Sequence, residues 1–85
     1  MGQGMIDETS FISRVTPIFR EELEQDHLQV TMDTTQEALE KWDSLAHVRL
    51  VLGIEQAFDV QLEASEIEKV NSVRAFYDIV RDRGQ

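Results

Sequence analysis

The chain has 85 residues, of which 17 are acidic and eight are basic, so its net charge is −9 at pH 7. This length suits one small domain, and the acidity argues against a protein that binds nucleic acid or an anionic membrane. With no cysteine and two histidines, the chain is not expected to hold a metal. No apolar run is long enough to span a membrane and no signal peptide is evident, which favours a cytoplasmic location.

Apolar residues recur at helical spacing and predict a first helix within residues 10–23. They are Phe11, Val15, Ile18, Phe19 and Leu23. Pro17 lies inside this segment, where proline costs a helix about 3 kcal/mol. Either the helix kinks there, or Thr16 caps a shorter helix that begins at Pro17. Because the apolar stripe continues across the proline, we expect one kinked or loosened helix.

Residues 25–43 form a long connection with strand-like fragments but no evident strand partner. We expect its apolar side chains to pin it to the core. They are Leu28, Val30, Met32, Leu39 and Trp42. A connection of this length in a compact domain is usually functional or well packed.

Three further helices are expected after this connection. One runs from Ser44 to about Phe58, and a short one follows, with Ser65 as its cap and Glu68 completing a capping box. Asn71 or Ser72 caps the last helix, whose apolar stripe is Val73, Phe76, Tyr77 and Val80.

The predicted fold is therefore all-α. It is a small four-helix bundle of three main helices and one short helix, with a long loop between the first two. We expect a flexible tail over residues 1–8, a domain over 9–82 and a C-terminal tail over 83–85.

On a helical wheel the helix that begins at Ser44 carries two apolar arcs. The first is as wide as a core-facing stripe and contains Leu50, Val51, Ile54 and Phe58. The second contains Leu45, Val48 and Leu52 and exceeds what a small core needs. This second arc is either a surface for a partner protein or a ridge that the long loop covers.

Ser44 lies at the start of this helix, where serine is a preferred N-cap, and Asp43 suits the positive end of the helix dipole. Capping by itself explains an Asp-Ser pair. A catalytic serine is not expected, because the Gly-x-Ser-x-Gly elbow is absent. His47 falls within the core arc, and we expect a half-buried packing residue near Trp42 rather than a general base.

The segments WDSLAHVRLVLGIEQAFDVQL and EIEKVNSVRAFYDIV resemble an acyl carrier protein, and the resemblance covers residues 9–82. Its core motif is Asp43-Ser44-Leu45. The Trp42 and His47 that surround this motif resemble free-standing carriers of specialised biosynthetic pathways. The resemblance implies that Ser44 carries 4′-phosphopantetheine, which a phosphopantetheinyl transferase installs from coenzyme A.

The resemblance also implies that the arm holds an acyl or ketide group as a thioester and that the protein, a monomer, catalyses nothing. Its partners would be acyl-loading and acyl-processing enzymes with basic docking surfaces. The residues expected to meet them are Leu45, Val48, Arg49, Leu52, Glu55, Gln56, Asp59 and Glu66.

The alternatives are an aminoacyl carrier, or an acidic helical interaction domain without a prosthetic group. A calcium-binding helix-loop-helix is excluded, because the loop lacks the spaced ligands and the central glycine. Arg49 and His47 lie where carriers of fatty-acid synthesis have a strongly acidic helix, which suggests a dedicated carrier with fewer partner enzymes.

Overall fold

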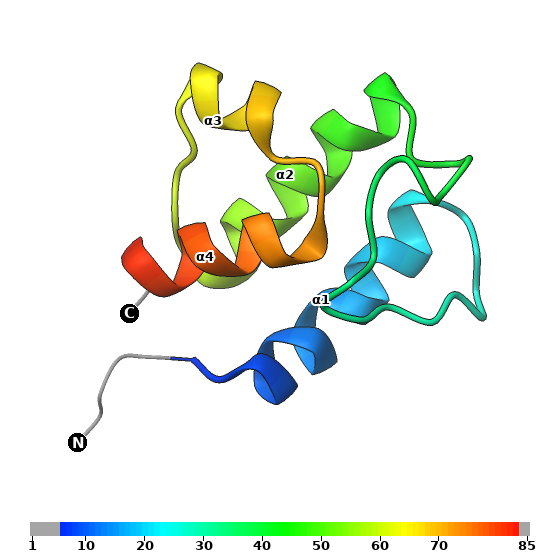
Figure 1. Cartoon of the computed structure of the whole chain (residues 1–85), viewed down its shortest axis with the longest axis horizontal. Helices are drawn as coiled ribbons and strands as arrows, with labels where there is room; N and C mark the ends of the chain where they lie inside the picture. Colours follow the sequence, from blue (N-terminus) through cyan, green and yellow to red (C-terminus); the bar gives the residue numbers. More distant parts are fainter. Residues whose placement is uncertain (1–5, 84–85) are drawn as a thin grey trace.

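The computed structural model describes residues 6–83 and contains four helices within this range (Figure 1). They are α1 (Glu8–Glu22), α2 (Ser44–Phe58), α3 (Ala64–Lys69) and α4 (Val73–Arg83). The predicted all-α fold, with three longer helices and one short one, is confirmed. Residues 1–5 and 84–85, most of the two expected tails, lie outside the described residues.

Helix α1 begins at Glu8, because the Asp7 carboxylate accepts a hydrogen bond from the amide of Ser10 at 2.8 Å. Residues 6–8, which we assigned to the N-terminal tail, thus contribute to the fold. The Tyr77 hydroxyl of α4 also donates to the carbonyl of Ile6 at 3.0 Å.

A single helix continues across Pro17, as the apolar stripe predicted. Thr16 does not cap a shorter helix, because its hydroxyl donates back to the carbonyl of Ile12 at 2.7 Å. The helix ends at Leu23, and Glu24 then adopts the left-handed conformation with φ of 57°. The next amide, of Gln25, bonds the carbonyl of Arg20 at 2.9 Å, which completes a Schellman-type ending.

The core lies between α1, α2 and α4 and contains the apolar stripes that the sequence predicted. Phe11, Phe19 and Phe76 are fully buried. The ring of Phe11 stacks on that of Phe58 with centroids 5.3 Å apart, which joins α1 to the end of α2. The predicted core arc of α2 is buried throughout: Leu50, Val51, Ile54 and Phe58.

The long connection is tied to the core, as expected. Val30 and Trp42 are buried, and Leu28, Met32 and Leu39 pack against the core from half-buried positions. Figure 1 shows this connection folded back beside the chain that joins α3 to α4.

Two backbone hydrogen bonds, which the sequence did not predict, hold the long connection there. The amide of Gln36 donates to the carbonyl of Asn71 at 2.8 Å, and that of Val73 donates to Thr34 at 2.9 Å. The strand-like fragments therefore do find a partner, in a single antiparallel bridge between Thr35 and Ser72.

The expected cap of α3 is wrong by two residues. The helix begins at Ala64 after Glu63, and the Glu66 carboxylate accepts from the Glu63 amide at 2.8 Å. Ser65 and Glu68, the predicted pair, are both exposed. At the next helix the prediction holds, since the Ser72 hydroxyl accepts from the amide of Ala75 at 3.1 Å.

Candidate functional site

The first turn of α2 is capped by Asp43 and not by Ser44, which corrects the expected cap. Asp43 has an extended backbone, and its carboxylate accepts a hydrogen bond from the amide of Ala46 at 2.9 Å. Ser44 is therefore the first residue inside the helix. Because the aspartate does the capping, the serine hydroxyl is not needed to begin the helix.

The hydroxyl of Ser44 stands free in solvent. Its side chain is exposed, and no residue within 6–83 hydrogen-bonds to it. The first amides of a helix point out of its N-terminus, where the dipole favours negative charge. A phosphate esterified to this oxygen would lie at that end of the helix.

His47 lies one turn beyond Ser44 and does not serve it as a base. The indole nitrogen of Trp42 donates to its Nδ1 at 2.9 Å, and its Nε2 lies 2.7 Å from the carbonyl oxygen of Ile67. The expectation of a half-buried histidine beside Trp42 is confirmed. Both ring nitrogens are engaged, so neither offers a free acceptor to the serine.

The second apolar arc of α2 forms an exposed ridge, which we call the α2 ridge. Leu45, Val48 and Leu52 have 62, 51 and 52% of their surfaces exposed, and they are the exposed large hydrophobic residues of the described chain. The long loop does not cover them. The alternative that the loop buries this arc is therefore wrong, and an exposed apolar strip extends along α2 from Ser44.

Polar side chains flank the α2 ridge. Arg49, Gln56 and Asp59 are exposed. Asp59 ends α2 in the left-handed conformation, with φ of 56° and its amide bonded to the carbonyl of Glu55.

A hollow of about 150 Å³ lies beside the start of α2, against the end of α1. Charged residues of both signs and apolar residues line it together. The lining residues are Glu22, Leu23, Glu24, Lys41, Asp43, Leu45, Ala46 and Arg49.

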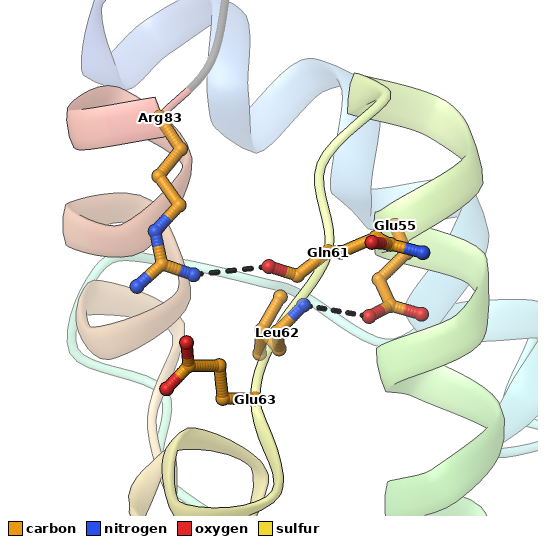
Figure 2. Close-up of a pocket in the computed structure, with 5 residues that line it drawn as sticks. All are labelled: Glu55, Gln61, Leu62, Glu63 and Arg83. Carbon is orange, nitrogen blue, oxygen red and sulfur yellow. Dashed lines mark hydrogen bonds between the residues drawn. The ribbon is translucent and has the colours of Figure 1, made fainter.

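Two of the carboxylates expected to meet partner proteins also form bonds within the domain. Glu55 accepts from the amide of Leu62 at 2.7 Å, and this bond fixes the chain as it leaves α2. Glu66 pairs with Arg83 of α4. Figure 2 shows the bond from Leu62 to Glu55 and a second bond of Arg83, which donates to the carbonyl of Gln61 at 3.0 Å. These bonds surround an open cleft of about 500 Å³.

The ionisation of Glu66 follows from these contacts. The guanidinium of Arg83 and, to a lesser extent, the amide of Glu63 donate to its carboxylate and hold its pKa below the ordinary value of 4.5. The pKa of Arg83 is raised in turn by the same pairing. Ionised Glu66 thus connects α3 to α4 through its ion pair with Arg83.

Within residues 6–83, no group of three or more potential ligands is placed to hold a metal ion. None of the helices in this part of the chain has the length and apolar character needed to cross a membrane.

A family model described as the phosphopantetheine attachment site matches residues 13–80 of the chain. This match includes α2 with the exposed Ser44, and it extends over most of the chain. Members of this family carry covalently attached 4′-phosphopantetheine and act as carriers. The residues at the start of α2 fit such a group, because they leave a hydroxyl unbonded at a helix N-terminus. The chain therefore belongs to the phosphopantetheine-binding family of carrier proteins.

Proposed function

We propose that Ser44 carries the 4′-phosphopantetheine arm and that the chain delivers acyl or ketide groups, held as thioesters, to successive enzymes. The observation that carries this proposal is the exposed Ser44 hydroxyl, which has no hydrogen-bond partner within residues 6–83 and stands at the first residue of α2. A flexible arm tethered there would raise the concentration of its cargo at each partner's active site.

The attachment chemistry needs an external catalyst. Transfer from coenzyme A forms a bond between Ser44 Oγ and phosphorus and releases the nucleotide portion of coenzyme A. Two ionisable residues close to Ser44 in the sequence are already bonded: Asp43 accepts from the Ala46 amide, and His47 is bonded at both nitrogens. The base that activates Ser44 would accordingly come from a phosphopantetheinyl transferase.

The α2 ridge is the surface that we propose for docking. Leu45, Val48 and Leu52 offer an apolar strip that a partner can desolvate, and they follow Ser44 along the same helix. Arg49 and Gln56 would form its polar rim, where contacts set orientation more than affinity.

The acidic part of the docking surface is smaller than the sequence suggested. Glu55 and Glu66 hold the domain together, so Asp59 is the candidate acid whose carboxylate is exposed beside α2. The net charge of −9 would still steer basic partner surfaces toward the chain, and this attraction would weaken in salt.

Acyl or ketide cargo is proposed over aminoacyl cargo because α2 resembles that of acyl carriers. A cytoplasmic location, where coenzyme A is available, is part of the same proposal. Incubating the arm-bearing protein with acyl-loading or with amino-acid-activating enzymes and measuring intact mass would decide the cargo. Stable loading by amino-acid-activating enzymes alone would overturn the acyl assignment.

The attachment site is tested by incubating the folded protein with coenzyme A and a broad-specificity transferase, followed by intact mass. Ser65→Ala is the matched control, because Ser65 is also an exposed serine near a helix start. We expect one pantetheine adduct on the wild type and on Ser65→Ala, and none on Ser44→Ala. A folded wild type that stays unmodified would instead support an interaction domain without a prosthetic group.

The docking surface is tested by the kcat/KM of the same transferase. Val48→Asp places a charge in the centre of the α2 ridge, and we expect a loss of about tenfold, as for a residue at the centre of an interface. Glu37→Gln alters an exposed carboxylate on the long loop and should leave kcat/KM unchanged. An unchanged value for Val48→Asp would place docking elsewhere.

A further inference from the structure

His47 lies in α2, one turn beyond Ser44, and contacts three other parts of the fold. Its Nδ1 lies 2.9 Å from the indole nitrogen of Trp42, and its Nε2 lies 2.7 Å from the carbonyl oxygen of Ile67 in α3. Its ring also lies against Trp42 and against Phe76 of α4, with centroids 6.0 and 6.3 Å apart. One side chain thus links the end of the long loop, the start of α2, α3 and α4.

The chemistry of these partners selects one form of the imidazole. An indole nitrogen can only donate, so Nδ1 of His47 accepts and carries no proton. Nε2 then carries the proton and donates to the carbonyl of Ile67. Only this neutral tautomer makes both bonds, since a protonated ring would point an N–H at the N–H of Trp42.

Helix α3 depends on such bonds more than the other helices do. It has six residues and none of them is buried, while Ile67 is half-buried. Ile67 packs against the core, and polar bonds to other helices include the one from His47 near the start of α2 and the pairing of Glu66 with Arg83 of α4. An element with little apolar burial opens locally at low cost, so each bond contributes a large share of its attachment.

We propose that neutral His47 is a positioning residue, which holds Trp42 and α3 against the first turn of α2 beside Ser44, and that its protonation releases them. Protonation of the ring would then change the surroundings of Ser44 at the start of α2. This link belongs to the unmodified chain, so it stands apart from the attachment of a group to Ser44.

The charged groups around His47 are occupied elsewhere or exposed. On its own helix, Asp43 holds the Ala46 amide and Arg49 is exposed. On the adjoining loop, α3 and α4, some charged groups are exposed: Glu40, Lys41, Glu68 and Lys69. Others form ion pairs: Glu66–Arg83, Arg74–Glu8 and Arg81–Asp78. The protonation of the imidazole itself is therefore what makes or breaks its bonds to Trp42 and Ile67.

The test is a nuclear magnetic resonance titration of the unmodified, ¹⁵N-labelled chain from pH 8 to 5, the range in which histidines change charge. The chain has one tryptophan, so its indole N–H gives one signal. At pH 8 we expect the ring nitrogens of His47 to report the Nε2–H tautomer. On acidification we expect the indole signal to shift together with the His47 ring signals. We expect the protection factors of the α3 amides, which compare each exchange rate with the intrinsic rate at the same pH, to fall about three- to tenfold.

Three variants separate the two bonds from general destabilisation. His27→Gln removes the other histidine, which is exposed, and should keep the response. His47→Asn keeps an acceptor near the Nδ1 position, whereas His47→Gln can donate toward Ile67, and neither side chain titrates in this range. We expect the indole signal to lose its pH dependence in both, with α3 amides exchanging faster in His47→Asn than in His47→Gln.

The proposal is overturned if wild-type His47 is the Nδ1–H tautomer, or if the wild-type indole signal ignores pH. It is equally overturned if the indole still titrates in a His47 variant. The wild-type titration decides by itself should a variant fail to fold. None of these results depends on whether Ser44 accepts an arm, so failure here leaves the attachment experiment unaffected.

Discussion

Replacing Asp43 and Ser44 separately by alanine distinguishes the residue that begins α2 from the residue that we propose to be modified. Asp43→Ala removes the carboxylate that accepts from the Ala46 amide at 2.9 Å. Losing such a cap costs about 1 kcal/mol, and for a domain of this size that lowers Tm by about 4–8 °C. Ser44→Ala removes an exposed hydroxyl without a partner in the described chain and should change stability by less than about 0.5 kcal/mol.

The assay pairs thermal unfolding, followed by circular dichroism, with intact mass after incubation with coenzyme A and a broad-specificity transferase. We expect Asp43→Ala to unfold earlier, while Ser44→Ala unfolds with the wild type and stays unmodified. Asp43→Asn is the conservative control, because asparagine caps about as well as aspartate and should retain most of the stability.

An equal loss of Tm in Ser44→Ala and Asp43→Ala would contradict the assignment of Asp43 as the residue that caps α2. That result would mean that the serine hydroxyl caps the helix in solution. An exposed hydroxyl with no structural task would then no longer support the attachment site.

Three further predictions concern the framework around this site. Ile54→Ala should cost about 2–5 kcal/mol because Ile54 is fully buried, whereas Leu52→Ala, on the exposed α2 ridge, should cost less than about 1 kcal/mol; denaturant unfolding of the two variants checks this difference. Glu24→Gly should raise stability by about 0.5–1 kcal/mol, since Glu24 holds φ of 57° and glycine adopts it without steric cost; an unchanged or lower urea midpoint would contradict this reason. Arg83 lowers the pKa of Glu66, so the stability that wild type gains over Glu66→Gln should be present above about pH 4.5 and disappear as pH falls through the lowered pKa; a gain that persisted at pH 2 would exclude this cause.

The apolar periodicity of the chain was enough to predict the three longer helices and their buried faces. The stripes at Phe11, Ile54 and Phe76 were correct because burial selects one side of a helix wherever the chain packs. The helix across Pro17 was also predictable, since the stripe did not change phase there.

The helix starts were less well determined by sequence. Asp43 and Ser44 are both good capping residues, whereas near the start of α3 the preferred type is Ser65 and not the residue that actually caps the helix, Glu63. A pattern of residue types does not say which amide a side chain can reach. The spacing of Glu63 and Glu66 matches a capping box, but glutamate at the cap position is a weak signal next to Ser65.

An acidic all-α domain, its buried stripes and the serine at the start of its second helix could all be predicted from the amino-acid sequence, because composition, periodicity and a local motif are properties of neighbouring residues. Three features became evident from the packed fold alone: Asp43 caps the helix, Glu55 and Glu66 bond to groups of the domain itself, and His47 joins Trp42 to Ile67. Most of these bonds connect residues of different elements, and all of them depend on the distances and directions that the packed fold imposes on each donor and acceptor.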